Sequence, residues 1–582
     1  MGKDIRQAFA ADRYDVVSQH SINGRTGYCA EHQTAKNAVT GKKKRAYYVE
    51  GSPYEMGYLM GYMAPEEIEL MSTIFIENII FEFFKDNNAE FFLIKWFKHL
   101  VKKYIQLKLK SWVYEFSQDV FKDIPYEYKQ EIYGIYRGYL AFCEKNQRKP
   151  IVTFRDLWVL NVGIDCLLSF FYNPNNFLEK FPKFPPEKPA ALFRVPIACN
   201  GFSVFGNATR DPAPGGAGEA HYHYFGRDFM FPTADVFQNV ACLIIYNPIP
   251  DNGRIPLVSM TAPGFAGSMT AMNTAGVAMG VDIAPSGNCD HRRDGFNSLL
   301  LVRDSIHRGS GAREALDNVV NAQRGVSWNY IIADGKNNQA VVVEAGLRTS
   351  KPESYPAPPE QLLNWGLLPD PQFFKTYENQ THQEGLMARW HDYKYPEAFL
   401  QFNRALFEYF GKMYDDSLFS ERGYISKRIN GKVESNCPFA FYFAPQREDK
   451  DDVLIVTNHF ITPTMRYCAM DKWTVEVVKG QLDDIQWRYD KLNDLILEHY
   501  GNIDWAQAWR IINFLAAEDG SYVPDYYDYT RDYEYRDEDG QTHKTKAVQG
   551  SISLCNLTTK VIQTRYGYFV DEPVTITLGN YV

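Results

Sequence analysis

Several features that define common protein classes are scarce or missing in this chain of 582 residues. Its nine cysteines include no C-x-x-C pair, which excludes a zinc ribbon or a thioredoxin-type site and favours a reduced compartment over a disulfide scaffold. No apolar run reaches about 18 residues, so we expect no transmembrane segment. The net charge of −9 excludes the class of general nucleic-acid binders, which carry a basic surface.

Signals for targeting and for cofactors are equally sparse. No apolar stretch follows Met1, so we expect no secretory signal and a cytoplasmic protein, with export only if a leader precedes this sequence. His221 and His223 share one face of a predicted strand, but no further ligand follows at the usual spacing. The sequence therefore predicts no metal and no cofactor.

The chain does have enough apolar material for a large core, because hydrophobic residues make up 45% of it and aromatic residues 15%. Ser52, Pro53 and Glu55 form the pattern of a helix start, with a capping box and a proline in the first turn. Gly57 and Gly61 lie on one face of that helix. We expect another backbone to approach closely there.

The N-terminal third of the chain is predicted to be largely helical. In residues 65–145, Glu and Lys recur every three or four residues among large apolar side chains. This pattern indicates amphipathic helices that cover a core, or alternatively an apolar lid for a greasy substrate. Residues 1–46 are polar and end in the basic run Gly41-Lys42-Lys43-Lys44-Arg45. They are interpreted as a solvated arm or an edge strand, with a binding patch as the alternative. The whole segment 1–198 is taken as one N-terminal unit.

The pattern changes after five prolines between residues 182 and 196, which mark an exposed linker. Strands and helices then follow in clusters: strands at 201–208, 220–230, 240–246, 257–260, 267–272 and 277–281, helices at 298–307 and 312–322, and strands at 330–333, 340–344 and 451–460. Such clustering indicates an α+β fold rather than regular βαβ alternation. Residues 199–582 are predicted to form one domain with an insertion around 345–450.

Cys199 stands at the start of this strand region. A free cysteine is usually a small buried hydrophobic residue, so its position alone says little. Its context is more informative, because three short motifs follow it along the chain. They are Gly226-Arg227-Asp228-Phe229, Met272-Asn273-Thr274-Ala275-Gly276 and Thr457-Asn458-His459-Phe460.

With these motifs and the opening segment 51–61, the chain resembles the N-terminal-nucleophile (Ntn) hydrolases of the choloylglycine hydrolase and penicillin acyltransferase superfamily, in particular the isopenicillin-N acyltransferase-like cysteine peptidases. The resemblance covers residues 48–62, 195–345 and 450–580. It implies a four-layer αββα Ntn-hydrolase sandwich with an added N-terminal helical region. It also implies that the thiol of Cys199 attacks the carbonyl of residue 198, so that Cys199 becomes an N-terminus.

The resemblance also implies roles for further residues. Asn273 would lie in the oxyanion hole, Asn458 would hold the α-amine or the oxyanion, and Arg227 would favour the thiolate. The alternatives are a turn asparagine, an ordinary asparagine at a strand end, and a structural ion pair with Asp228 or another acid. An α-amine has a pKa near 8 and a cysteine thiol one of about 8.5, so an N-terminal cysteine can supply its own base.

One position departs from the family pattern. The motif G-R-N-x-D ends in an aspartate that contacts the amine of the nucleophile, and this chain has Met230 there. Asp228 lies two positions earlier on the same strand face, about 6.6 Å away. Asp228 is therefore the candidate for that contact. Without it, the amine would be held less firmly and activity would be weak or altered.

These expectations describe a self-processing N-terminal-cysteine amidohydrolase or acyltransferase that acts on linear acyl amides through an acyl-thioester at Cys199. The predicted partners are a small-molecule acyl-amide substrate and the cleaved segment itself, with 1–198 bound to 199–582 as a heterodimer or acting as a covering propeptide. A lipid-directed deacylase is the variant that the aromatic helices favour. The alternative is a non-catalytic relative that serves as a binding or structural protein, which Met230 supports.

Overall fold

The computed structural model of the protein describes most of the chain, in ranges separated by gaps. The described residues are 3–82, 98–172, 198–210, 222–249, 253–286, 289, 295–347, 381–382, 385–395, 427–429, 432–434, 446–462, 465, 482–515, 531–537 and 539–582. The predicted linker at 182–196 and most of the predicted insertion at 345–450 lie outside these residues.

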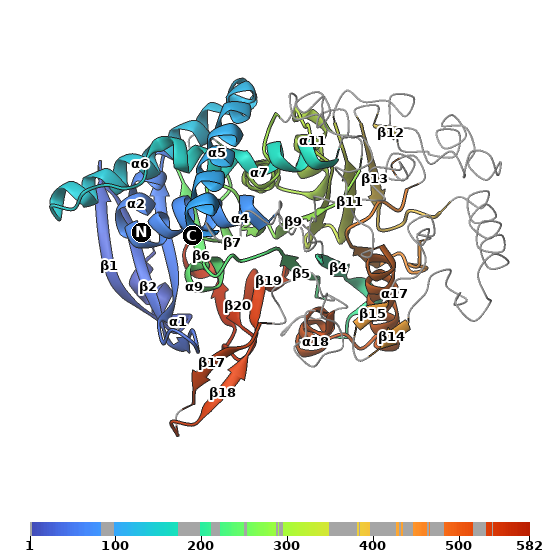
Figure 1. The fold of residues 1–582 in the computed structure, drawn as a ribbon. Coiled ribbons are helices and arrows are strands. Elements are labelled where there is room, and N and C mark those ends of the chain that lie inside the picture. The colour runs from blue at the N-terminus through green and yellow to red at the C-terminus, as the bar shows by residue number, and fades with distance from the viewer. Residues whose placement is uncertain are drawn as a thin grey trace, which may run out of the picture.

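Within the described residues, eleven strands form one large sheet, and its neighbouring strands are antiparallel except for the parallel pair β3 and β6. The order is β1-β2-β3-β6-β7-β8-β9-β10-β11-β13-β12, with β1 and β13 at opposite sides of the view in Figure 1. The strands are β1 (Tyr14–Ile22), β2 (Arg25–Lys36), β3 (Lys43–Gly51), β6 (Cys242–Pro248), β7 (Leu257–Thr261), β8 (Thr270–Asn273), β9 (Val277–Ile283), β10 (Trp328–Asp334), β11 (Gln339–Ala345), β12 (Thr381–His382) and β13 (Leu386–Trp390).

A second, antiparallel sheet has the order β16-β4-β5-β19-β20-β21. Its strands are β4 (Asn200–Val204), β5 (Tyr224–Met230), β16 (Val453–Val456), β19 (Ala547–Asn556), β20 (Val561–Tyr568) and β21 (Val574–Thr577). Every residue of β4 and β5 is buried, so both faces of these strands are covered. Two further strand pairs belong to neither sheet: β14 (Lys427–Ile429) with β15 (Lys432–Glu434), and β17 (Tyr533–Arg536) with β18 (Thr542–Thr545). The pair of β17 and β18 projects from the body of the molecule (Figure 1).

The two sheets face each other where β5 meets β9. A Cβ atom at Gly280 of β9 would lie 2.2 Å from the side chain of Arg227 on β5, so glycine is what allows this close approach. Helices α10 and α11 pack on the large sheet, whereas α17 and α18 pack on the second sheet. These helices are α10 (Ser298–Arg308), α11 (Ala312–Asn321), α17 (Leu482–Glu498) and α18 (Trp505–Leu515).

The remaining helices lie mainly in the N-terminal segment, on the side of the large sheet, except the short α9 (Phe237–Val240), which packs on β19 and β20 of the second sheet (Figure 1). The others are α1 (Ile5–Ala11), α2 (Pro53–Met63), α3 (Pro65–Glu69), the π-helical turn Leu70–Phe75, α4 (Ile76–Glu82), α5 (Lys98–Asp119), α6 (Tyr126–Lys145) and α7 (Phe154–Tyr172). The helical pattern predicted for 65–145 is confirmed over its described part. None of the described helices has the length and apolar character needed to cross a membrane.

The predicted start and close approach of α2 are both confirmed. Ser52 and Glu55 form a reciprocal capping box. Cβ atoms at Gly57 and Gly61 would lie 2.1 and 2.0 Å from backbone oxygens of α6, so α2 and α6 touch backbone to backbone. Residues 14–51 form β1 to β3. Of these, only β1 lies at the edge of the large sheet, whereas β2 and β3 are inner strands, so the segment is more than the solvated arm or edge strand that the sequence suggests.

Candidate active site

Cys199 directly precedes β4 and is fully buried. Its Sγ atom lies between the backbone groups of Met230 on β5: it accepts from the N–H at 3.4 Å and donates to the carbonyl oxygen at 3.5 Å. Burial, followed by the charge of Asp282, raises the pKa of the Cys199 thiol to about 12, against the opposing effect of Arg227. In this continuous chain the thiol is therefore protonated at neutral pH.

Asp228 contacts Asn200, the residue after Cys199. Its Oδ1 accepts from the backbone N–H of Asn200 at 2.6 Å, and its Oδ2 accepts from Asn200 Nδ2 at 2.8 Å. Burial raises the pKa of Asp228 to about 7, although the Asn200 contacts and Arg488 act in the opposite direction. The carboxyl group thus fixes the backbone immediately after Cys199.

Arg227 forms a buried ion pair across the two sheets. Its Nη2 donates to Asp282 of β9 at 2.9 Å, and its Nη1 donates to Thr270 Oγ1 at 2.9 Å. The alternative role of Arg227 is a structural ion pair with Asp228 or another acid, and the acid with which it pairs is Asp282. Burial raises the pKa of Asp282 to about 6, while Arg227 lowers it.

Arg488 of α17 is a site residue that the sequence analysis missed. Its guanidinium donates to the Cys199 carbonyl oxygen at 2.7 Å, to Asn200 Oδ1 at 2.5 Å and to Asn458 Oδ1 at 3.0 Å. The side chain is fully buried. Arg488 is separated from Cys199 by 289 positions in the chain, and no local motif marks it, whereas Asp282 at least stands out as an acid within an apolar strand.

These contacts define one group of buried polar residues, which we call the Cys199 cluster. Its members come from both sheets and from α17: Cys199, Asn200, Arg227, Asp228, Asp282 and Arg488. Asn458, after β16, joins the cluster through Arg488 and donates from Nδ2 to the Ile283 carbonyl oxygen at 2.8 Å. Of the predicted site residues, Cys199, Arg227, Asp228 and Asn458 thus lie in this connected region.

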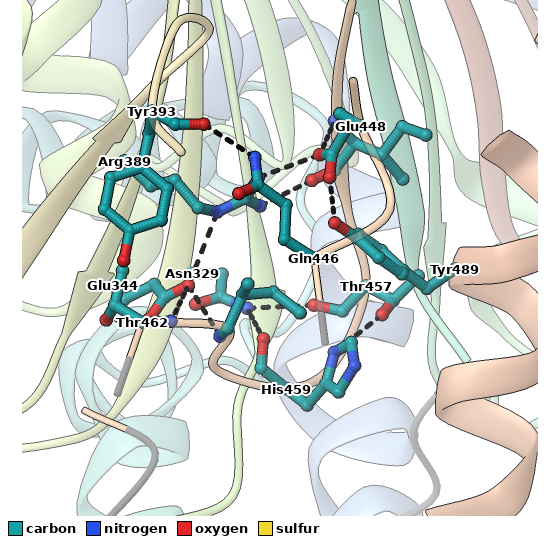
Figure 2. Close-up of polar contacts among 12 residues, drawn as sticks. Asn329, Glu344, Arg389, Tyr393, Gln446, Glu448, Thr457, His459, Thr462 and Tyr489 are labelled. Atoms are coloured by element: carbon teal, nitrogen blue, oxygen red, sulfur yellow. Dashed lines mark hydrogen bonds and ion pairs between the residues drawn. The ribbon is translucent and has the colours of Figure 1, made fainter. Parts of the chain in front are cut away.

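The backbone that carries Asn458 is held from both sides (Figure 2). Asn329 of β10 donates to the carbonyl oxygens of Thr457 and His459, each at 2.9 Å. Glu344 of β11 accepts from the backbone N–H of Thr462 at 3.0 Å. These contacts fix residues on both sides of Asn458, so its side chain is presented from a rigid loop.

A second group of buried charges lies next to this loop, and we call it the Arg389 cluster. Its members are Glu344, Arg389, Glu448 and Tyr489. Arg389 donates to Glu448 at 2.8 Å and lies 3.6 Å from Glu344, while Tyr489 donates its hydroxyl hydrogen to Glu448 (Figure 2). Burial raises the pKa of Glu344, and Arg389 opposes that shift.

Asn273 holds a turn, and its described hydrogen bonds go to residues outside the Cys199 cluster. Its Nδ2 donates to the carbonyl oxygens of Ile306 and Gly309, both at 2.8 Å. Its Oδ1 accepts from the backbone N–H groups of Ala275 and Val277, both at 3.0 Å. Both amide hydrogens are thus used to hold the surrounding backbone, which favours the turn interpretation of this residue over the oxyanion role.

An apolar cavity of about 70 Å³ adjoins the Cys199 cluster. Met269 and Phe229 belong to its lining; the Met269 carbonyl accepts from Arg227, and the Arg227 guanidinium lies 4.8 Å from the centre of the Phe229 ring. Helical residues of the N-terminal segment, including Phe75 and Leu160, line the cavity as well. The cavity therefore lies between the N-terminal helices and the strands that carry the cluster.

Comparisons with known proteins give weak similarities. No family model matches the chain. An uncharacterized protein of Archaeoglobus fulgidus is 26% identical over 491 residues, which is 84% of this chain and 60% of that protein. The chain therefore spans about 60% of the length of this relative.

Three solved structures also show a distant likeness. A mutant of the conjugated bile acid hydrolase from Clostridium perfringens matches with a TM-score of 0.31 and 11% identity, over 66% of this chain and 92% of that chain. The Caenorhabditis elegans ortholog of N-acylethanolamine-hydrolyzing acid amidase gives 0.30 and 10%, over 62% and 93%. Penicillin V acylase from Agrobacterium tumefaciens gives 0.24 and 8%, over 66% and 78%. Such low scores carry no argument for this chain.

Proposed function

We propose that the protein is a self-processing Ntn amidohydrolase or acyltransferase whose nucleophile is Cys199. Helices α10 and α11 on one sheet, and α17 and α18 on the other, support the four-layer αββα arrangement for the catalytic part. Cys199 precedes β4, an inner strand of the second sheet, which is a suitable place for a nucleophile that becomes an N-terminus.

The observation that carries this proposal is the Cys199 cluster itself. Two arginines and two aspartates are buried around one thiol and its neighbouring peptide groups. Removing a charge from water is unfavourable by several kcal/mol per ion, so such an arrangement indicates a role beyond packing. Carboxyl groups with pKa values raised toward neutrality next to a nucleophile are typical of catalytic sites.

The proposed chemistry has two stages. Cleavage before Cys199 releases an α-amine, which then accepts the thiol proton and yields the nucleophilic thiolate. The thiolate attacks the carbonyl carbon of an acyl amide, the amine leaves, and water or another amine resolves the acyl-thioester. Arg227 favours the thiolate, Asp228 holds the new N-terminus, and Asn458 with Arg488 stabilises developing negative charge.

We assign residues 1–198 to a segment that stays bound after cleavage. Support comes from the parallel pairing of β3 with β6 and from the contribution of α4 and α7 to the apolar cavity. The apolar lining supports an apolar acyl group in the substrate, although about 70 Å³ holds only a few methylene groups, so the lipid-directed variant rests on the aromatic helices of the N-terminal segment. The acyl amide remains the substrate class in either variant.

A non-catalytic relative is the second candidate, and one observation favours it. The thiol of Cys199 is fully buried and its pKa is raised to about 12, which describes an unreactive cysteine in the uncleaved chain. In the proposed enzyme this is the state before processing. In the non-catalytic relative it is the final state.

Intact-mass measurement of the purified protein separates the two candidates. The proposal expects chains of 198 and 384 residues, because 582 − 198 = 384, that co-purify as a complex. A Cys199→Ala variant should give the single full-length chain. A panel of acyl amides with increasing acyl length then tests the substrate class. A wild-type chain that stays intact and hydrolyses none of them would favour the non-catalytic relative.

A further inference from the structure

Asn200 reaches back across the nucleophile to the carbonyl group that self-cleavage would attack. Its Nδ2 atom lies 3.1 Å from the carbonyl oxygen of Ala198 and 2.8 Å from Oδ2 of Asp228. Asparagines in turns usually accept hydrogen bonds from nearby backbone N–H groups. Here the side chain instead donates to a carbonyl two positions earlier, so an ordinary turn role does not account for the contact.

The chemistry of the neighbours fixes which way the amide of Asn200 points. Arg488 only donates hydrogen bonds, and it lies 2.5 Å from Oδ1 of Asn200. The Ala198 carbonyl oxygen only accepts, so the NH₂ group must face it. The reversed orientation would place NH₂ against the guanidinium and two oxygens against each other. The donor is therefore held toward the Ala198 oxygen before any reaction begins.

We propose that Asn200 is a catalytic residue of the self-cleavage step, in which its Nδ2–H stabilises the negative charge that develops on the Ala198 oxygen. The inference rests on the proposed function, because it needs cleavage before Cys199. A donor that is already oriented toward a developing oxyanion contributes a factor of about 10²–10³ to a rate. Asp228 and Arg488 act as positioning residues for this donor.

The bonds change as follows. A bond forms between Cys199 Sγ and the carbonyl carbon of Ala198, and the oxygen of Ala198 becomes the oxyanion. The bond between that carbon and the Cys199 nitrogen then breaks, and the thiol proton ends on this nitrogen. Water hydrolyses the resulting thioester, which leaves a carboxylate on Ala198 and restores the thiol of Cys199.

The test compares self-cleavage rates of full-length variants, measured by intact mass over time after purification. Asn200→Ala should process about 10²–10³-fold more slowly than the wild type. Ser203→Ala is the matched control, since Ser203 lies on the same strand and its Oγ loses a buried hydrogen bond of 2.7 Å to His223. Ser203 lies three residues after Asn200 along β4, about 10 Å away. The Ser203→Ala variant should therefore self-cleave at the wild-type rate.

A second variant keeps the test informative if Asn200→Ala folds poorly. Asn200→Asp conserves the size of the side chain, and its carboxylate form has no hydrogen to donate, whereas its protonated form does. The ratio of its rate to the wild-type rate should therefore rise as the pH is lowered from about 8 to about 5. Burial and, while it is ionised, the Asp228 carboxylate raise the pKa of the introduced group, whereas the Arg488 guanidinium beside the Oδ1 position lowers it. The decisive comparison is therefore made at about pH 8, where the introduced carboxylate is ionised.

The outcomes separate the inference from the function on which it rests. A wild-type chain that never cleaves removes the proposed function. A wild-type chain that cleaves, together with Asn200→Ala at an equal rate, overturns the role of Asn200 alone. A rate for Asn200→Asp equal to the wild-type rate at about pH 8, where the introduced carboxylate has no hydrogen to donate, would show that no donor is needed at this position and would overturn the inference as well.

Discussion

Both buried polar clusters contact the loop of residues 457–462 that carries Asn458. They differ in the groups that their buried charges contact. In the Arg389 cluster, charged groups meet each other and the backbone N–H groups of residues such as Ile455 and Ile461. In the Cys199 cluster, Arg488 donates to the Cys199 carbonyl. Asp228 and Arg488 also hold Asn200, which donates to the carbonyl of Ala198. Burial of charge is therefore common to both, whereas a cysteine whose preceding peptide carbonyl accepts from a buried side-chain amide is specific to one.

The buried arginine and carboxyl side chains therefore have different roles in the two clusters. The Arg389 cluster fixes a loop, because its acids accept from backbone N–H groups at 2.8–3.0 Å and hold two strands together. The Cys199 cluster has the groups that a bond rearrangement requires. Substitutions in the first should act mainly on stability, whereas substitutions in the second should change reaction rates as well as stability.

The largest effect is expected for Cys199→Ala. One thiol would serve both self-cleavage and amide hydrolysis, so the variant should lose both activities completely. Its thermal unfolding midpoint should change little, because alanine leaves only a small gap beside the backbone of Met230. Intact mass and an acyl-amide assay measure the two activities. Cleavage before residue 199 in this variant would remove the autocatalytic part of the proposal.

The next prediction tests the division between the clusters with one substitution in each. Arg488→Met removes the guanidinium from the Cys199 carbonyl and from Asn458, and should slow self-cleavage by about 10²-fold or more. Arg389→Met leaves two buried glutamates without their cation, so it should lower the free energy of unfolding by about 3–5 kcal/mol. Urea unfolding and intact mass measure both quantities for each variant.

In the folded fraction, Arg389→Met should self-cleave at a rate within about tenfold of the wild type, because it acts on Asn458 only through the loop. Equal losses of rate in the two variants would mean that the clusters form one functional unit.

The third prediction concerns pH and Asp228. Its pKa is about 7 in the folded chain and 3.8 when exposed, so the folded state binds the extra proton between these values. Its contribution to stability is therefore complete below about pH 4 and is lost as the pH rises through about 7, by at most about 4 kcal/mol.

Asp228→Asn cannot titrate, so its stability relative to the parent should increase from about pH 4 to about pH 7. Urea unfolding of both proteins in the Cys199→Ala background, which prevents cleavage, measures this difference. A constant difference across that range would contradict a raised pKa for Asp228.

The sequence predicts local features of this molecule well and long-range ones poorly. The close contact of α2 with α6 follows from two glycines one turn apart, and most strands of the catalytic part follow from apolar patterns flanked by turns. Arg488 reaches the Cys199 carbonyl, and Asp282 reaches Arg227, only through the folding of distant segments. A single arginine in a mixed-charge helix carries no local signal of that contact.

The motif that contains Arg227 and Asp228 shows the same difference between local features, which the sequence predicts, and long-range contacts, which it does not. Arg227 and Asp228 are adjacent on β5, and the sequence marks both. Their partners differ, because successive side chains of a strand point to opposite faces. Arg227 crosses to Asp282 of the other sheet, whereas Asp228 meets Asn200 of the neighbouring strand. Which partner each finds depends on the packing of the two sheets.

A smaller effect on reaction rates is expected for Asn273→Ala. The variant loses the amide contacts to Ile306 and Gly309, so the free energy of unfolding should fall by about 1–3 kcal/mol. Self-cleavage and the kcat for an acyl amide should stay within about threefold of the wild type. A drop in kcat of about 10²–10³ with unchanged stability would instead support the oxyanion role implied by the family resemblance.

The smallest effect is expected for Met230→Leu, at the position where the family pattern has an aspartate. Cys199 contacts Met230 through the backbone N–H and carbonyl groups, and the substitution keeps both. Leucine has nearly the volume of methionine, so the free energy of unfolding should change by less than about 1.5 kcal/mol. The self-cleavage rate, measured by intact mass, should equal that of the wild type within error. A large loss of rate would mean that the thioether itself, and not the strand backbone, holds the thiol of Cys199 in place.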